Sequence, residues 1–185
     1  MPTSPFSPDK LRAEINPEGG FATNERFEVI IAGGIINSID PDSKTSRRLQ
    51  FLCENVAIPT KSIAASDKFI YGTSYQMPYR QTFAELSMSF LVTDSMKEKT
   101  FFDNWQKKIV DEETGDLKFY SGYTCDITIS KYSKTQSNFT NPKYQIKVEN
   151  AWPSIVAEIQ LNHSGGNEVV RLPVTFQYKK WRQTV

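Results

Sequence analysis

Histidine and cysteine are almost absent from the sequence. Only His163, Cys53 and Cys125 occur among the 185 residues. A zinc site built from cysteine and histidine needs four ligands, so one chain cannot assemble it. The neighbours of His163 are typical of a hairpin turn, which predicts an exposed loop histidine rather than a catalytic one. Both cysteines share the phase of apolar neighbours, so we expect small buried side chains rather than nucleophiles.

Long apolar runs, glycine-rich nucleotide motifs and an excess of one charge are also missing. No run approaches the roughly 18 to 20 apolar residues of a membrane helix, and residues 1–10 lack the apolar segment of a signal peptide. We therefore expect no stable membrane insertion and a chain that stays in the cytoplasm. Lysine plus arginine (22) balances aspartate plus glutamate (21), which removes a whole-chain attraction to nucleic acid. We predict no enzyme, no metal and no cofactor.

The chain divides into an arm and one domain. Prolines and glycines are concentrated in residues 1–25, and such a composition resists regular structure. We predict a flexible N-terminal arm there, followed by a single domain over residues 26–185.

Within the domain, alternating apolar and polar residues predict a mainly β fold. Strands are expected near residues 26–31, 49–59, 123–129, 144–148, 158–161 and 170–178, with a loop at residues 37–47. One amphipathic helix is predicted to start at Thr93 or Asp94 and to continue through Phe101, Trp105 and Ile109. The sum is an antiparallel β-sandwich or partly closed β-barrel with one flanking α-helix.

Residues 68–92 have the pattern of an unusually long hairpin. We predict that it reverses at residues 78–81. Its second face carries small neutral side chains without the lysines that usually guard a free edge. Two interpretations stay open: an ordinary sheet with one wet face, or a hairpin that joins its neighbours edge to edge in a closed barrel around a channel.

Three stretches make the sequence resemble a known family. The most specific one is C-terminal, where Asn-Ala-Trp-Pro-Ser at residues 150–154 leads into residues 156–161, Asn167-Glu168 and residues 174–181. Residues 51–59 and the helix residues 102–106 add weaker matches. Over residues 48–181 the chain resembles the tail tube proteins of contractile-tailed, myovirus-type bacteriophages.

The resemblance implies a structural virion protein. Members of that family form hexameric rings that stack into a hollow tube inside a contractile sheath, and the tube conducts DNA during ejection. The implied partners are further copies of the chain, the tail sheath, baseplate and tail-terminator proteins, the tape-measure protein and transient DNA. The implied location is the phage tail, assembled in the cytoplasm of the host bacterium.

The resemblance also implies roles for particular residues. The candidate lumen-lining residues are Ile70, Gly72, Ser74, Gln76, Glu85, Ser87 and Ser89. The candidate subunit or ring contacts are Asp40, Asp42, Lys44, Arg47, Lys61 and Ser62. A mainly neutral lumen would let DNA slide, because few fixed cations would face its phosphates.

Two other functions stay open. A tube-like baseplate protein that initiates the tube would share the same sequence features and would differ in copy number. A monomeric β-sandwich could bind a ligand through the aromatic face of Tyr71, Tyr75 and Tyr79, although we expect these rings to pack on Phe90 and the helix.

Overall fold

The computed structural model describes residues 7–16, 20–42, 44–69, 71–134, 139–163 and 168–185. The strands are β1 (Phe27–Ala32), β2 (Cys53–Val56), β3 (Lys61–Lys68), β4 (Tyr75–Phe83), β5 (Leu86–Leu91), β6 (Cys125–Lys131), β7 (Tyr144–Val156), β8 (Arg171–Gln177) and β9 (Lys180–Gln183). The helices are α1 (Pro8–Ile15), α2 (Gly34–Ile39), α3 (Lys44–Leu52), α4 (Lys97–Ile109) and α5 (Tyr120–Tyr123).

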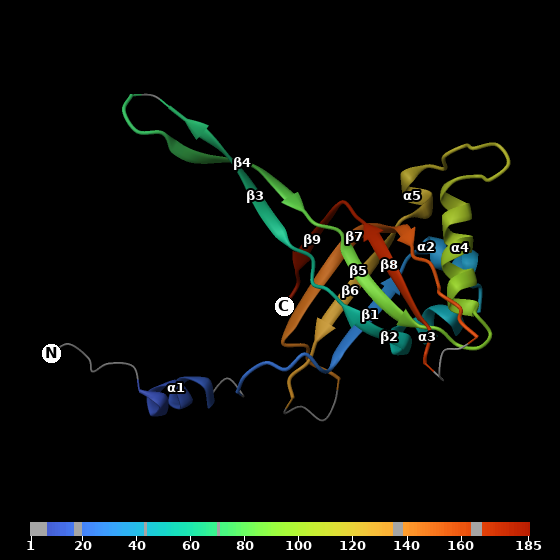
Figure 1. Cartoon of the computed structure of the whole chain (residues 1–185), viewed down its shortest axis with the longest axis horizontal. Helices are drawn as coiled ribbons and strands as arrows, with labels where there is room; N and C mark the ends of the chain where they lie inside the picture. Colours follow the sequence, from blue (N-terminus) through green and yellow to red (C-terminus); the bar gives the residue numbers. More distant parts are fainter. Residues whose placement is uncertain (1–6, 17–19, 43, 70, 135–138, 164–167) are drawn as a thin grey trace.

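The strands form one large antiparallel sheet and one separate hairpin (Figure 1). The large sheet has the order β1-β6-β7-β8-β5-β2, and β9 pairs with β7. The first part of β7 pairs with β6 and β9, whereas its second part pairs with β8. Near the end of the first part Asn150 has a left-handed φ of 55°, and within the second part the register shifts between Pro153 and Ile155. The mainly β, antiparallel fold is confirmed, and the described strands form a bent sheet rather than a closed barrel.

Helix α4 covers one face of the bent sheet and completes the core. Phe102 packs on Phe90 and Phe176, with ring centroids 5.2 and 6.1 Å apart. Trp105 is fully buried, and its indole N–H donates to the carbonyl of Tyr123 at 2.8 Å. Burial of each such ring stabilises the folded state by about 2–3 kcal/mol. The predicted helix and its apolar stripe are confirmed.

The start of α4 differs from the prediction. The helix begins at Lys97, after Met96 in a left-handed conformation, so Thr93 and Asp94 lie outside it. Thr93 still organises this end, because its hydroxyl donates to the buried carboxylate of Glu98 at 2.9 Å and its backbone N–H donates at 3.1 Å. Glu98 thereby reaches back like the acidic residue of a capping box.

A long hairpin exists, but it spans residues 61–83 rather than the predicted 68–92. Strands β3 and β4 pair with each other from Lys61↔Phe83 to Lys68↔Tyr75, so the chain reverses within residues 69–74. Strand β5 pairs with β2 and β8 instead. Pro78 lies within β4 rather than at the turn. A proline is tolerated there because it lies beside a register shift in a two-stranded sheet, where one missing backbone N–H breaks no continuous ladder.

Three further expectations were wrong. Residues 37–47 are mostly helical, since they hold the end of α2 and the start of α3. The Asp40 carboxylate explains this: it accepts hydrogen bonds from the backbone N–H groups of Thr45 (2.6 Å) and Ser46 (3.0 Å) in the first turn of α3. Residues 49–52 belong to α3 rather than to a strand, and residues 158–161 form no strand. Strand β9 was not predicted.

The N-terminal arm contains a helix that its composition did not predict. Ser7 caps α1 by accepting from the N–H of Lys10 at 3.4 Å, and Pro8 occupies the first turn, where its missing N–H costs nothing. Figure 1 shows α1 apart from the bent sheet.

Candidate assembly surface

The β3–β4 hairpin projects from the body of the domain (Figure 1). None of its described residues belongs to the buried core. Its large apolar side chains lie open to solvent: Ile63 (65% exposed), Phe69, Tyr71 (94%), Tyr75, Met77 and Tyr79. A two-stranded hairpin is marginally stable by itself in water. The hairpin therefore has the properties of a surface that another chain completes.

The exposed tyrosines correct one expectation. Tyr71, Tyr75 and Tyr79 do not pack on Phe90 or on the helix, because they lie on or beside the projecting strands. Phe90 packs on Phe102 within the core instead.

The cross-strand register gives the hairpin two distinct faces. The near face holds Phe83 and Lys61, which contact the body of the domain. The far face holds Ser62 and Thr82, whose hydroxyl oxygens lie 2.6 Å apart. By alternation and cross-strand pairing, the far face continues through Ala64, Ser66, Lys68, Tyr75, Met77 and Arg80.

An aromatic cluster fixes the base of the hairpin to the body. The ring of Phe83 packs against Tyr178 at 6.1 Å and against Trp181 at 6.5 Å, and the Lys61 ammonium lies 5.8 Å from the Trp181 ring. The hydroxyl of Tyr178 donates to the carbonyl of Ala84, and burial raises the pKa of Tyr178 to about 12. This cluster sets the direction in which the hairpin leaves the domain.

The solvent face of β5 and β8 is small, polar and nearly neutral. Leu86, Met88 and Phe90 point into the core, so the alternate residues Ser87 and Ser89 point away from α4. Ser87 pairs with Thr175 and Ser89 with Pro173, whereas the Glu85 carboxylate accepts from the side-chain amide of Gln177. We call this surface the outer sheet face.

One ion pair lies on the outer sheet face at its β2 edge, between Arg171 of β8 and Glu54 of β2. The Arg171 guanidinium donates to both carboxylate oxygens of Glu54, at 2.6 and 3.0 Å. This hydrogen-bonded pairing lowers the pKa of Glu54, so the carboxylate remains ionised and neutralises the arginine.

The predicted lumen residues are distributed over three places. Glu85, Ser87 and Ser89 share the outer sheet face; Gly72 and Ser74 lie at the hairpin turn, and Gln76 lies on β4, opposite Asp67. Ile70 lies outside the described residues. The prediction that one hairpin carries all seven is wrong, because the reversal lies at residues 69–74.

The predicted contact residues fall at two places. Asp40, Asp42, Lys44 and Arg47 surround the α2–α3 connection, where Lys44 pairs with Asp42 at 3.0 Å. Lys61 and Ser62 lie at the base of the hairpin. Arg47 and the Asp42–Lys44 pair are exposed, and their role as subunit contacts stays a prediction.

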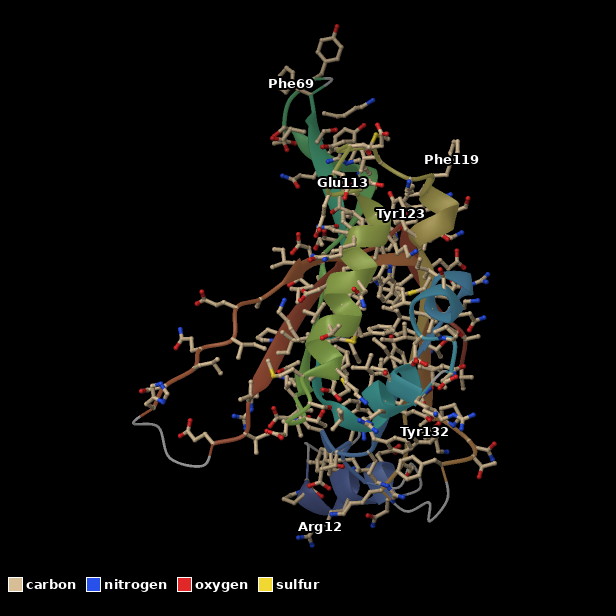
Figure 2. The ribbon with its side chains drawn as sticks, turned by 90° about the vertical axis from the view of Figure 1, so that its right-hand side faces the viewer. Arg12, Phe69, Glu113, Phe119, Tyr123 and Tyr132 are labelled. Atoms are coloured by element: carbon tan, nitrogen blue, oxygen red, sulfur yellow. The ribbon has the colours of Figure 1, made fainter. Side chains whose placement is uncertain are left out.

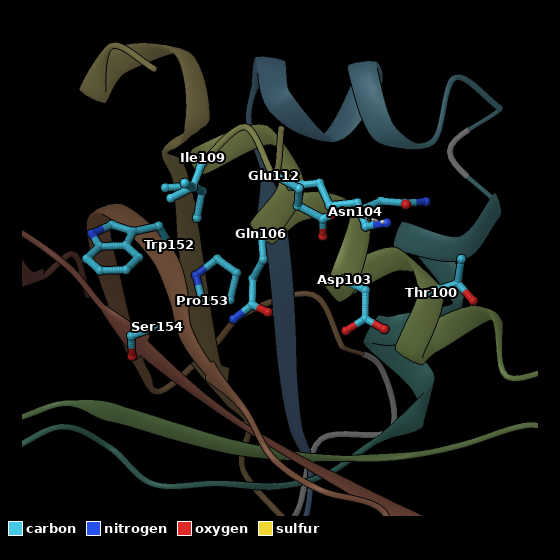
Figure 3. Close-up of a pocket in the computed structure, with 11 residues that line it drawn as sticks. Thr100, Asp103, Asn104, Gln106, Ile109, Glu112, Trp152, Pro153 and Ser154 are labelled. Carbon is cyan, nitrogen blue, oxygen red and sulfur yellow. Dashed lines mark ion pairs between the residues drawn. The ribbon is translucent and has the colours of Figure 1, made fainter. Parts of the chain in front are cut away.

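A groove of about 640 Å³ separates α4 from β7 (Figure 3). Trp152, Pro153 and Ser154 line one side, and helix residues including Asn104 and Gln106 line the other. Among the described residues no group of three histidine, cysteine or acidic side chains could hold a metal. Pro153 is buried at the register shift of β7, which makes the Trp-Pro sequence a feature of the bend in the sheet.

The cysteines are buried, as predicted. Burial raises the pKa of the Cys53 thiol to about 12 and also raises that of Cys125, so both thiols are protonated and unreactive at neutral pH. His163 is exposed in a turn, as predicted. None of the described helices is both long and apolar enough to span a membrane.

These features define a mainly β domain with a projecting hairpin whose apolar side chains are exposed. The family model for phage tail tube proteins matches residues 22–184, and the chain belongs to that family. A search of curated proteins found no match.

Solved structures share the fold at low sequence identity. A chain in the sheath–tube complex of an extracellular contractile injection system, PVC, in its extended state has a TM-score of 0.62 and 15% identity, covering 97% of this chain and 99% of that chain. A chain in the PVC sheath/tube terminator has a TM-score of 0.62 and 14% identity, covering 89% and 97%. A chain in the baseplate of the anti-feeding prophage has a TM-score of 0.60 and 13% identity, covering 89% and 96%.

Proposed function

We propose that this chain is a non-enzymatic structural protein that forms hexameric rings. The rings stack into the hollow inner tube of a contractile phage tail, and DNA passes through that tube. The partners are the tail sheath, baseplate, terminator and tape-measure proteins. Membership of the tail tube family supports the proposal, as do the sheath, tube, baseplate and terminator complexes that contain its structural neighbours.

The projecting hairpin carries the proposal. Both edges of the β3–β4 sheet lack a neighbouring strand among the described residues, so their backbone donors and acceptors are available for pairing. A neighbouring copy that pairs along an edge would satisfy these groups and cover the exposed apolar side chains. Repetition around a ring closes the contact and leaves no free edge.

The outer sheet face is the proposed lumen wall. Ser87, Ser89 and Thr175 are neutral, and Glu54 offsets Arg171. DNA binding is driven by cations that contact phosphates, so a wall of this composition would not hold the passing strand.

Electron microscopy at rising protein concentration, paired with light scattering for mass, tests the assembly. We expect hollow rings and tubes, with sixfold symmetry in end views. A chain that remains monomeric at high concentration, even with a preformed baseplate as template, would contradict the proposal.

A hairpin excision separates assembly from folding. Lys61 and Phe83 are neighbours across the sheet, so a short Gly-Ser turn can replace residues 62–82 without touching the core. We expect a folded monomer with a melting temperature close to that of the intact chain, and no rings. Normal tubes from this variant would refute the role of the hairpin.

A baseplate initiator is the second candidate. The structural likeness to a chain in an anti-feeding prophage baseplate supports it, since an initiator shares the tube fold. Copy number distinguishes the two roles. Quantitative mass spectrometry of purified particles would find many copies for a tube protein and only a few copies for an initiator.

A further inference from the structure

One end of the domain carries an ordered acidic loop. Residues 110–119 contain four carboxylates and one lysine, and they connect α4 to α5. The Asp111 carboxylate accepts from the backbone N–H groups of Glu113 (3.1 Å) and Thr114 (3.4 Å), which lowers the pKa of Asp111. A bridge between Val110 and Leu117 fixes the loop further.

Two carboxylates of this loop are available to another molecule. Glu112 pairs with Lys107 at 3.3 Å, and Asp111 lies 3.9 Å from Lys118. Glu113 and Asp116 are exposed, and neither belongs to an ion pair found among the described residues. The loop thus presents a net negative charge.

A basic cluster lies where β6 ends and β7 begins. Its members are Arg26, Lys131, Lys134 and Lys143, and no ion pair found among the described residues includes them. Arg26 and Lys131 donate to backbone carbonyls, those of Lys134 and Glu25 respectively, so neither charge is neutralised. The acidic side chains beside the cluster are Glu25 and Glu28, and Glu28 accepts from the hydroxyl of Tyr132.

The three lysines surround a hollow of about 260 Å³ that also contains Thr23. An incoming carboxylate would accept from the flanking ammonium groups. The hollow therefore has the charge and the donors that suit an acidic side chain.

The acidic loop and the basic cluster lie at opposite ends of the domain. Figure 2 shows Glu113 toward one end and Tyr132, which lines the basic hollow, toward the other. Strand β6 runs between these ends, because it follows α5 and finishes at Lys131; its seven residues span about 23 Å.

We propose that the acidic loop of one copy binds the basic cluster of a second copy, and that this contact stacks one ring on the next. The proposal rests on the proposed tube function. A contact between two different patches at opposite ends is heterologous, so each copy bound leaves a further patch open. Repetition builds an open-ended stack with one polarity, which a tube requires.

Charge reversal at each end, followed by the combination, tests the contact. We expect Glu113→Lys with Asp116→Lys to raise the concentration needed for tubes by roughly tenfold or more, because like charges would then face each other. Lys134→Glu with Lys143→Glu should have the same effect. The quadruple variant restores opposite charges and should return toward the wild-type concentration.

A matched control removes the effect of net charge. Lys97→Glu with Lys179→Glu makes the same charge change as the basic-end variant, but at exposed positions outside both patches. We expect normal tubes from it. The stacking contact would be overturned if this control lost tube formation as much as the reversed variants do. It would also be overturned if the quadruple variant did not recover tube formation.

The readout separates this inference from the proposed function. Single rings without tubes in both reversed variants, beside wild-type tubes, would support the contact. If both reversed variants form the same tubes as the wild type, the stacking contact is refuted and the proposed function is not. A wild-type chain that forms neither rings nor tubes would refute the proposed function instead.

Discussion

Ile63→Ala is expected to separate the stability of the subunit from the stability of the assembly. Ile63 lies on β3 and is 65% exposed in the single chain. Truncation should therefore change the free energy of unfolding by less than about 0.5 kcal/mol. If a neighbour buries this side chain, each contact loses about 2 kcal/mol. Because 1.4 kcal/mol is a factor of ten, the concentration needed for assembly should rise about 30-fold.

Urea denaturation and sedimentation of assembled material measure the two effects separately. Leu172→Ala is the matched control, since Leu172 is fully buried in β8 and its truncation should cost about 2–5 kcal/mol of unfolding free energy. That control lowers the urea midpoint, whereas Ile63→Ala leaves it unchanged. An Ile63→Ala chain that assembles at the wild-type concentration would refute the hairpin as an interface.

Two predictions concern the folded subunit. Gly33→Ala should destabilise it by about 1–3 kcal/mol, because a Cβ there would lie 2.8 Å from the Cβ of Cys125. Gly34→Ala, which meets nothing within 4 Å, should leave the thermal midpoint unchanged or higher. The raised pKa of Cys53, about 12, keeps its thiol protonated when folded. The unfolded thiol ionises from about pH 9, so stability should fall as the pH rises from 9 toward 12 in denaturation series; Cys53→Ala should flatten that slope, and an unchanged slope would contradict the assignment.

Periodicity predicted the elements whose partners lie in the core. Helix α4 and strands β1, β6 and β8 each bury one face in the core, so the spacing of their apolar residues shows which face packs inward. The same logic failed in residues 68–83, because the projecting hairpin buries neither face along most of its length, so no apolar face distinguishes its arms.

Local composition failed where one hydrogen bond decides the structure. Asp40 belongs to an Asp-Pro-Asp sequence that is typical of loops, yet its carboxylate caps α3 through Thr45 and Ser46. Ser7 does the same for α1 within a segment rich in proline. Such a cap is compatible with both a loop and a helix, and tertiary packing selects between them.

The residues that carry the family resemblance are structural. Asn150 turns β7 in a left-handed conformation and Pro153 sits at its register shift, so one strand serves two sets of partners. That bend lets the sheet enclose α4 while its other face stays open. The proposed assembly residues lie outside the motif: the hairpin, the acidic loop and the basic cluster. The motif therefore identifies the fold, whereas the contacts of the ring and of the stack depend on residues that the motif does not specify.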